Sequence, residues 1–401
     1  MTEKKPDQDF NPVKILKRVA WPLGAWPFSD NIFSIFRAFI VLLIQISLMA
    51  SVTKEITLGC SNADEVIDLI VWVQCAIIAS VKVILIRFYH KNVSQTITSI
   101  NEDWSTIKEP TLVDIMKSYA SFGNFVCNAQ FIFSCSELLL LMAKNVLSVW
   151  QTNNLIISNS SEILFQRPLP QGTKCLFMNV STTSYIFIYI FQMIQCITTS
   201  IGNVGLDVFF FLLAMHICGQ LEILCEEIRN INGDNFNSIK RQIVSLSQRH
   251  KLLLGKAMDL EETFSLIIML QLAINITAIS LFGISVIVTS RENGFLAALK
   301  PMTAIQVLMI QLFLYCYAGD LLTSKVQMVT LASYQSLWFE FPISLSKDML
   351  FIMMKAGRPF ALSAGKLLPI NMNTFSNILK LSVSYFSVFR LMLDARYMTQ
   401  E

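Results

Sequence analysis

Long apolar stretches recur along this chain of 401 residues, at a length that a membrane requires. Crossing the apolar core of a bilayer, roughly 30 Å thick, takes about 20 mostly apolar residues in a helix. Only 15% of the residues are charged, whereas soluble proteins carry about 25%. The stretches that meet the requirement are Phe33–Val52, Val66–Phe88, Phe122–Leu147, Tyr185–Ile217, Phe264–Thr289, Phe295–Ala318 and, interrupted by one lysine and several serines, Phe375–Leu393. The sequence therefore predicts an all-α membrane protein with seven transmembrane helices.

The basic residues outside these stretches fall mainly in alternate connections. Of the 31 Lys and Arg residues, the two sets of connections hold 20 and 6, and five lie inside spans. Because loops rich in Lys and Arg stay on the cytoplasmic side, we expect a cytoplasmic N-terminus and an extracellular C-terminus. Glycosylation sequons at Asn159 and Asn179 fall in a connection that this assignment places outside, whereas two others, at Asn92 and Asn275, do not. A G-protein-coupled receptor has the opposite orientation, so the charges argue against that class.

Helical periodicity continues past the membrane after span 4 and before span 5. Apolar positions keep helical spacing through Leu212–Ile231 while charged residues appear between them, and Ile239–Phe264 follows the same pattern. Such segments are typical of amphipathic helices. We expect these two segments and Val326–Met354 to form a cytoplasmic helical domain. Either contacts between subunits or packing within one chain would hold it together. Ile343–Met354 is too short to span and is expected to be a cytoplasmic or interfacial helix.

Residue patterns that support catalysis or metal binding are absent from the sequence. Histidines occur only at His90, His216 and His250, far apart and without a second plausible ligand nearby. The sequence contains no Gly-rich phosphate loop or nucleophile elbow, and a net charge of +3 does not indicate nucleic-acid binding. We therefore expect no enzyme activity, no metal, no cofactor and no nucleic-acid partner. Of nine cysteines, only Cys60 and Cys175 fall in extracellular loops, as a disulfide or as two free thiols.

Two acidic residues lie deep within predicted spans, where ionisable side chains are costly and mark candidate functional positions. Glu137 lies in the middle of span 3, and Asp207 follows Gly205 in span 4. Each either pairs with Lys82 of span 2 or faces a water-filled pocket. Structural pairing and a ligand contact are the two alternatives for these carboxylates.

Polar residues in span 7 recur at three- and four-residue steps and share one helix face: Asn377, Lys380, Ser384 and Ser387. A hydrophilic stripe on a spanning helix faces protein or water. The stripe continues into the apolar Val388, Leu391 and Met392. A wet face closed by an apolar ring is what a dewetting gate requires. The pattern therefore fits a pore, and ordinary hydrogen bonding between helices is the alternative.

Several segments near the C-terminus form a recognisable succession: Leu312–Lys325, Tyr334, Trp338, Pro342, Pro359–Lys366, Phe375–Lys380 and Ser384–Phe386. This succession resembles the C-terminal pattern of insect odorant receptors almost throughout. Weaker similarity appears at Leu23–Pro27, at His216 and at Arg249–His250. The resemblance covers the whole chain and is specific over roughly the last ninety residues. Gustatory receptors share the topology but end in a different span 7 motif, and they are the nearest alternative.

The resemblance implies a function that the residue patterns alone do not. Members of this family are subunits of ligand-gated, non-selective cation channels that detect small, mostly apolar volatile molecules. Tuning subunits assemble with a shared co-receptor, Orco, as tetramers around one central pore in the plasma membrane of olfactory neuron dendrites. Each subunit contributes its last helix, 7b, to the pore, and cytoplasmic helices form an anchor domain. Leu391 stands where the co-receptor has a glutamine, which indicates a tuning subunit.

The resemblance also implies positions for the functional residues. Odorants in this family bind in a small apolar cavity in the outer half of each subunit, between spans 2, 3, 4 and 6. The corresponding ligand-binding candidates are Val73, Ile77, Leu138, Met142, Tyr185, Tyr189, Met193, Thr303 and Ile305. The pore and gate candidates are Lys380, Ser384, Val388, Leu391 and Met392. Plain packing is the alternative for the aromatic and methionine positions.

These expectations divide the chain into successive segments. The division is residues 1–32 as a cytoplasmic N-terminal or interfacial segment, 33–217 as spans 1–4 with the odorant pocket, 218–263 as cytoplasmic anchor helices, 264–320 as spans 5 and 6, 321–370 as cytoplasmic anchor and helix 7a, 371–393 as pore helix 7b, and 394–401 as an extracellular tail.

Overall fold

A computed structural model describes residues 12–28, 31–60, 63–158, 168–178, 180–232 and 235–398, without the side chains at 12, 63–64, 144–158, 291–293, 389 and 392–398. The predicted sequon asparagines Asn159 and Asn179 lie outside the described residues. The elements are α1(Pro12–Ala20), α2(Ile32–Leu58), α3(Ala63–Phe88), α4(His90–Thr106), α5(Pro110–Ser158), α6(Thr182–Ser200), the π-helical turn η2(Ile201–Gly205), α7(Leu206–Arg229), α8(Phe236–Asn293), α9(Phe295–Gln335), the 3-10 turn η3(Trp338–Glu340), α10(Ile343–Ala356), β1(Ser363–Ala364), β2(Leu368–Pro369) and α11(Met372–Met398).

Six spans are confirmed as helices long and apolar enough to cross a membrane. They lie within α2, α3, α5, the α6–α7 pair, α8 and α9. The seventh predicted span forms α11, whose 27 residues reach about 40 Å at a helical rise of 1.5 Å per residue. Lys380 and the serines make α11 less apolar than the other six. The protein is therefore an all-α, multi-pass membrane protein in which α11 differs in composition from the remaining spans.

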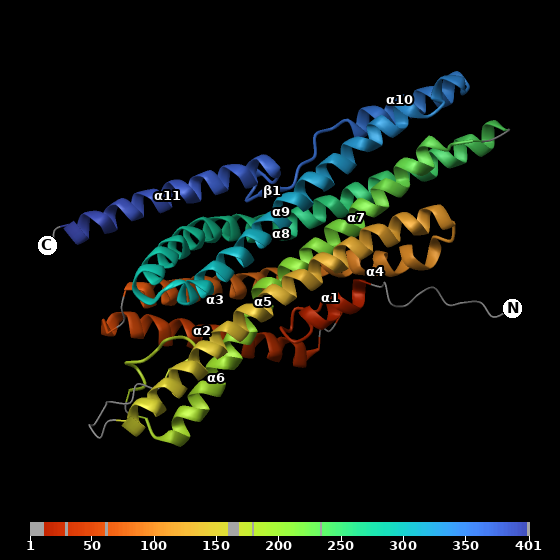
Figure 1. Ribbon diagram of the computed structural model, residues 1–401. Coiled ribbons are helices and arrows are strands. Elements are labelled where there is room, and N and C mark those ends of the chain that lie inside the picture. The colour runs from red at the N-terminus through yellow and green to blue at the C-terminus, as the bar shows by residue number, and fades with distance from the viewer. Residues whose placement is uncertain are drawn as a thin grey trace.

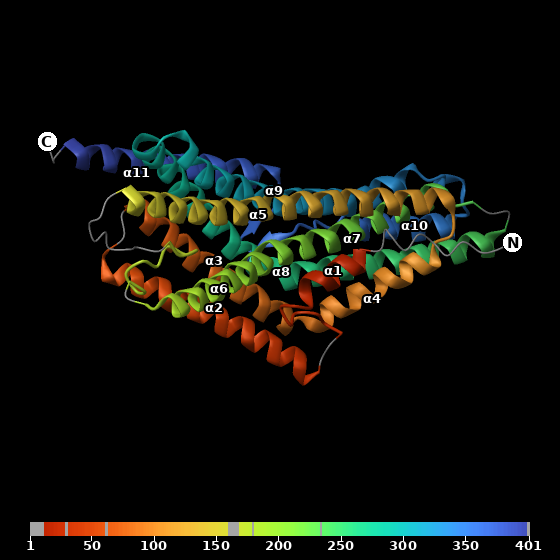
Figure 2. The same cartoon turned by 60° about the horizontal axis from the view of Figure 1, so that its bottom comes forward.

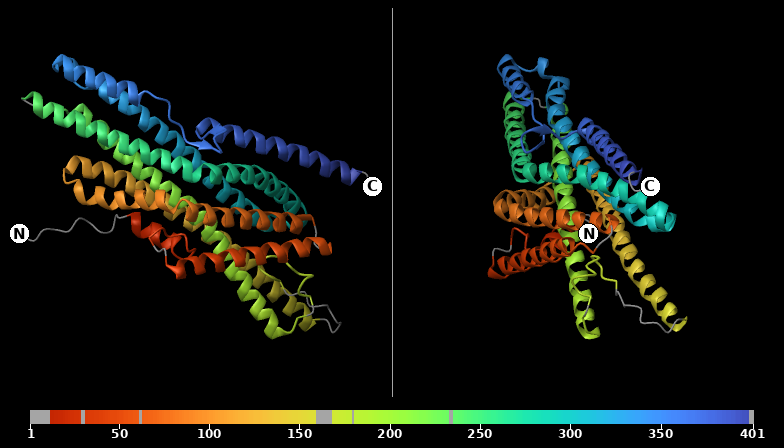
Figure 3. Two further views of the ribbon diagram at one scale, coloured as in Figure 1. Left: turned by 180° about the vertical axis from the view of Figure 1, so that it is seen from behind. Right: turned by 90° about the vertical axis from the view of Figure 1, so that its left-hand side faces the viewer.

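The connections between helices gather at two opposite ends of an elongated bundle (Figures 1 and 3). At one end lie α10 and the turn from α4 to α5. At the other lie the turn from α8 to α9 at Gly294 and the last turn of α11. The α2 end and the segment before α6 also meet there, because Cys60 and Cys175 form a disulfide. Of the two alternatives for these cysteines, a disulfide or two free thiols, the disulfide is confirmed.

The central helix of the bundle is α7. Most of its 24 residues are buried, because α5, α8 and α9 all pack against it. The sequence predicted an amphipathic helix at Leu212–Ile231, with one polar face. In α7, most residues of this segment are buried. Two of its glutamates pair with other helices of the same chain: Glu227 accepts from Arg249 at 2.6 Å, and Glu222 pairs with Lys325. A helix that is apolar on nearly all sides is buried, and this segment packs within the chain. Contacts between subunits stay a prediction.

A π-helical turn divides the predicted span 4. It falls between α6 and α7, at two glycines that permit close approach of neighbours. A Cβ on Gly202 would lie 3.0 Å from the Cβ of Ala79, and one on Gly205 would collide with Val19 of α1. Turns of this kind insert a bulge into a helix and are frequent at functional sites. Span 4 therefore bends where α1 and α3 pack against it.

The segment Val326–Met354 contains parts of two helices. Helix α9 ends at Gln335, the chain turns through η3, and α10 begins at Ile343, which confirms a separate helix at the predicted Ile343–Met354. Pro342 is the N-cap of α10, where a residue without an amide hydrogen is tolerated. A short antiparallel pair, β1 with β2, then leads into α11. From there α11 lies along one side of the bundle beside α8 and α9 (Figure 2).

Candidate ligand-binding site

A cavity of about 150 Å³ lies among α3, α5, α6, α8 and α9. Its wall is mostly apolar and includes Val71, Leu138, Ala278, Phe282 and Leu308. Four of these five are buried side chains and belong to one packed cluster with Ala304. A cavity of about 150 Å³ in another protein binds benzene. The cavity is therefore large enough for a molecule built around one small ring or a short chain.

Charged residues form part of the same wall. Lys300 at the start of α9 pairs with Asp68 of α3, so the two helices are joined across the cavity. Glu137 of α5 also lines the cavity. Within the described part of the chain, Glu137 has no hydrogen bond or ion pair, and Lys300 and Asp68 are the charges that act on it. Glu137 is therefore a carboxyl group of this wall that has no partner among the described residues.

Beneath the cavity lies a fully buried polar network centred on Asp207. Its Oδ1 is 2.5 Å from the Nζ of Lys82, and both side chains are completely buried. The hydroxyl of Tyr315 also donates to Oδ1, and the amide of Gln311 donates to Oδ2. Of the two sequence alternatives for Asp207, pairing with Lys82 therefore holds. Gln311 both lines the cavity and bonds this carboxylate, so it links the ligand space to the network.

The π-helical turn places Asn203 in the cavity wall. Its Nδ2 donates to the backbone oxygen of Cys75 at 3.0 Å, and its own backbone oxygen accepts from Lys82 at 3.2 Å. Two hydrogen bonds thus join the π-helical turn to α3. Asn203 also connects the wall to the buried ion pair through Lys82.

A second amide in the wall, Gln271 of α8, bonds across to α9. Its Nε2 donates to the Oδ1 of Asn275 at 2.9 Å and to the Oε1 of Gln311 at 3.1 Å. Three amide side chains and one carboxylate are therefore joined in sequence from α8 through α9 to α7. The chain of bonds thus runs from the cavity wall to the buried pair of Asp207 and Lys82.

The nine predicted ligand-binding residues do not all meet at this cavity. Leu138 lines it, and Ile305 packs against the buried cluster beside it. Val73 packs instead with a cluster formed by α2 and α3, and Tyr185 donates to the oxygen of Pro168 with its ring near Tyr189. The remaining four, which are not part of the cavity wall, are Ile77, Met142, Met193 and Thr303. All nine positions, Leu138 included, remain predictions as ligand contacts.

The predicted pore and gate residues occupy the outward side of α11. Lys380 and Ser384 are exposed, and Val388 and Leu391 are 50% and 70% exposed in the single chain. The side chain of Met392 lies outside the described residues. On the opposite side, the ring of Phe386 packs on Gly283, and the backbone oxygen of Ser382 accepts from Ser280 at 3.1 Å. The bundle therefore binds one side of α11 and leaves the polar stripe outward.

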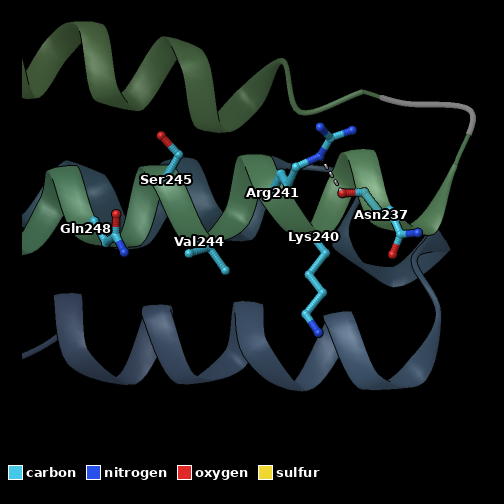
Figure 4. A pocket seen from close by; sticks show the side chains of 6 residues that line it. All are labelled: Asn237, Lys240, Arg241, Val244, Ser245 and Gln248. Carbon is cyan, nitrogen blue, oxygen red and sulfur yellow. Dashed lines mark hydrogen bonds between the residues drawn. The ribbon is translucent and has the colours of Figure 1, made fainter.

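A further depression lies at the start of α8 (Figure 4). All six lining residues come from that one helix, and among them Arg241 donates to the backbone oxygen of Asn237 at 3.2 Å. The side chain of Lys240 points toward a neighbouring helix (Figure 4). Because one helix provides the whole lining, this is a surface groove and does not enclose a small molecule. Among the described residues, no group of three or more His, Cys, Asp or Glu side chains is arranged to hold a metal ion.

Sequence reasoning missed the amide residues of the wall. Asn203, Gln271 and Gln311 are uncharged, so they do not interrupt an apolar run in the way that Glu137 does. A usable signal was present: Gln271 and Asn275 are four residues apart, as are Gln311 and Tyr315, and residues at that spacing share a helix face. Polar pairs of this kind inside a span indicate a buried network.

Comparisons with known proteins agree with this architecture. A family model described as 7tm odorant receptor matches residues 62–383. The chain is similar to Odorant receptor 47a of Drosophila melanogaster, 23% identical over 215 residues, and to Odorant receptor 10 of Aedes albopictus, 22% identical over 213 residues. These matches cover 52% and 51% of this chain and 54% and 55% of the relatives. The chain thus spans about half the length of the curated relatives it matches.

Two solved structures have the same fold. One is the insect olfactory receptor OR5 from Machilis hrabei in complex with eugenol, with a TM-score of 0.76, 14% identity, and coverage of 96% of this chain and 100% of that chain. The other is described as the structure of the same receptor, with a TM-score of 0.76, 12% identity, and coverage of 94% and 97%. At this identity the likeness shows the fold.

Proposed function

The chain belongs to the 7tm odorant receptor family, and on that basis we propose that it is a tuning subunit of an odorant-gated, non-selective cation channel. It acts with the Orco co-receptor in the plasma membrane of olfactory neuron dendrites and detects small, mostly apolar volatile molecules. The observation that carries this proposal is the mostly apolar cavity among five spanning helices. Apolar pockets with a few convergent polar groups are typical of small-molecule sites.

Burial of apolar surface supplies the binding energy in such a site. Each Å² of apolar area removed from water contributes about 25 cal/mol, and the wall presents leucine, valine and phenylalanine side chains to the ligand. The polar groups fix the orientation of the ligand. A ligand that fits stabilises one arrangement of α8 and α9, because both helices line the cavity.

The position of α11 supports the gating part of the proposal. Its inner side packs on α8 and α9, so a shift of those helices is passed to α11 directly. Its outward stripe, with Ser384 and Val388, is left for other subunits or for water. In the open channel the apolar ring of Val388 and Leu391 widens and hydrates, and in the closed channel it excludes water.

The proposal is tested by filling the cavity. Leu138→Trp places an indole in the ligand space and should raise the half-maximal concentration of every agonist by about tenfold or abolish the response, since overpacking is unfavourable. The matched control is Leu139→Trp, because Leu139 is the next residue of α5 and is 65% exposed. Currents are recorded from cells expressing each variant with Orco, with surface labelling of the chain.

Equal dose–response curves for Leu138→Trp and the unmodified chain, at equal surface levels, would remove this cavity as the odorant site. A loss of response in both Leu138→Trp and Leu139→Trp would indicate general damage to α5 and would also count against the assignment.

A further inference from the structure

We propose that one side of α1 binds the headgroup of an anionic phospholipid in the cytoplasmic leaflet of the membrane. Lys14, Lys17, Arg18 and Trp21 recur at three- and four-residue steps, so they share one helix face. The amide of Trp21 donates to the backbone oxygen of Lys17 at 3.0 Å, which keeps Trp21 in the helical register. All four side chains are exposed. Together they are called the basic face, and none of them lines the cavity of the proposed function.

The opposite side of α1 is packed into the bundle. Leu16, Val19 and Ala20 are buried, because α1 contacts α4, α7 and η2 (Figure 1). Residues 12–28 contain three basic residues and no acidic one. The bundle thus takes the apolar side of this amphipathic helix and leaves the basic face directed outward.

The position of α1 along the bundle is set by the π-helical turn η2. Val19 packs on Gly205 of this turn, where an added Cβ would lie 2.5 Å from the Cγ1 of Val19. Before η2, the 19 residues of α6 cover about 29 Å at a rise of 1.5 Å per residue. That length is close to the roughly 30 Å of a bilayer core. With the start of α6 on the predicted extracellular side, η2 and α1 lie at the cytoplasmic boundary of the membrane.

Lipid-facing side chains adjoin the basic face at the start of α2. Ile32, Phe33 and Phe36 are between 59% and 83% exposed, as residues in contact with acyl chains are. The guanidinium of Arg37, the next residue, lies 4.2 Å from the centre of the Trp21 ring. Tryptophan is enriched at the level of the lipid headgroups. A phospholipid can therefore place its chains along α2 and its phosphate on the basic face.

The charges of the basic face are not neutralised by the chain itself. Lys17 and Arg18 have no ion pair or side-chain hydrogen bond among the residues that the structure describes. With Lys14 and Arg37 they place four cations beside span 1. Clusters of about four to eight basic residues next to a span are typical of sites for anionic lipids. A soluble phosphate or an acidic protein segment would use these charges but not the apolar start of α2.

The basic face is held in position before any lipid binds. Arg87, at the end of α3, donates to the backbone oxygen of Gly24 and, at 3.2 Å, to the hydroxyl of Ser34 on α2. The turn after α1 is thereby fixed to both α2 and α3. A preformed site loses little conformational freedom on binding, so a bound lipid should stabilise the folded chain measurably.

The test measures the melting temperature of the detergent-solubilised full chain with added lipids. The probes are the dioctanoyl forms of phosphatidylserine, phosphatidylinositol bisphosphate and phosphatidylcholine, beside inorganic phosphate and inositol trisphosphate, which have no acyl chains. A ligand that binds the folded state raises the melting temperature, and the concentration dependence gives its apparent affinity. We expect the two anionic lipids to raise the melting temperature and the other three compounds to leave it unchanged.

A double variant tests the basic face itself. Lys17→Gln with Arg18→Gln removes two cations and should raise the concentration of anionic lipid that is needed by about tenfold or more. The matched control is Lys240→Gln with Arg241→Gln, since these residues are also adjacent and exposed. They lie at the start of α8 (Figure 4), beyond the 24 residues of α7, which extend about 36 Å from η2. The control should respond to the lipids as the unmodified chain does.

The binding measurement does not depend on channel current, so its failure would leave the proposed function untouched. Equal stabilisation by phosphatidylcholine would overturn the inference, as would an unchanged lipid response in the variant of the basic face. Equal weakening in both double variants would show a general effect of net charge and would also overturn it. Stabilisation by inositol trisphosphate or inorganic phosphate as strong as that by the lipids would assign the basic face to a soluble anion and contradict a lipid site.

Discussion

Lys82 and Asp207 are fully buried partners within the spanning part of the bundle. Removing one partner of a buried pair leaves an unpaired charge, which typically costs about 3–5 kcal/mol. We therefore expect Asp207→Asn to lower the stability of the protein by about that amount, measured as a fall in melting temperature of the detergent-solubilised receptor. Asparagine keeps one acceptor oxygen in place of two, so the hydrogen bond from either Gln311 or Tyr315 is lost as well, and this loss acts in the same direction.

Glu226→Gln is the matched control for that substitution. Glu226 bonds Arg229 at 3.3 Å near the surface, where both side chains are partly exposed. An exposed ion pair contributes about 0.2–1 kcal/mol, so the control should melt close to the unmodified protein. Equal melting temperatures for Asp207→Asn and Glu226→Gln would show that the buried pair is not structurally important.

The sequence indicates charged residues of the site more readily than neutral ones. Glu137 and Asp207 stand out because an ionisable residue in an apolar run is costly, and both belong to the region of the cavity. The partner of Asp207 could not be decided from sequence, since Lys82 lies 125 residues earlier in the chain. The hydrogen bonds of Asn203 and Gln271 depend on which way each side-chain amide is turned. Only the surrounding bonds determine that orientation.

The close approach of α9 to the segment before α11 depends on Gly319. A Cβ at this position would collide with the backbone oxygen of Ile370, which precedes α11. We expect Gly319→Ala to destabilise the protein by about 1–3 kcal/mol, as overpacking does, and to alter basal current because α11 is displaced. Thermal melting and whole-cell recording provide the two measurements.

Gly255 offers a control in an open position. It also lies inside a helix, α8, but a Cβ there would meet no atom within 4 Å. Since alanine favours a helix over glycine by about 1 kcal/mol, Gly255→Ala should leave stability unchanged or raise it. If Gly319→Ala behaves like Gly255→Ala, α9 and α11 are not tightly coupled through this contact.

The proposed gate on α11 is tested by making it more polar. Val388→Ser replaces an apolar ring member with a hydroxyl, and a constriction that closes by dewetting then hydrates more easily. We expect raised basal current in cells that express the variant with Orco. Val383→Ser is the control, because Val383 is also exposed on α11 and is not a predicted ring member. Unaltered basal current in Val388→Ser at normal surface levels would place the gate elsewhere.

Helices were easier to predict than the interruptions between them. Length and apolarity identify the spans in α2, α3, α5, α8 and α9, because a bilayer imposes both. The π-helical turn in span 4 was not predicted, since it depends on neighbours from α1 and α3 that pack on Gly202 and Gly205. The break at Pro342 had a sequence signal, because the residue before a proline leaves the helical region.

For the whole molecule, the arrangement of connections agrees with the distribution of basic residues. Connections predicted to be cytoplasmic share the α10 end of the bundle, and those predicted to be extracellular share the end of the Cys60–Cys175 disulfide. An odd number of crossings between the start of α2 and the end of α11 places the two ends of the chain at opposite ends of the bundle. Fold class could thus be inferred from sequence, whereas the shape of the cavity could not, since residues from five helices determine it.

The orientation of the bundle in the membrane is tested by epitope tags at the two termini. The charge distribution predicts that intact cells expose a C-terminal tag and hide an N-terminal tag until the membrane is permeabilised. Exposure of the N-terminal tag on intact cells would reverse the orientation and favour a G-protein-coupled receptor.

Patch-clamp recording tests most directly whether binding in the cavity opens a cation channel. Cells that express this chain with Orco are challenged with a panel of small, mostly apolar volatile molecules, beside cells that express Orco alone. We expect an inward current in the first cells, carried by both Na⁺ and K⁺ and absent when Leu138→Trp replaces the unmodified chain. A surface-expressed complex that passes no ligand-evoked current, or a current equal to that of Orco alone, would contradict the account.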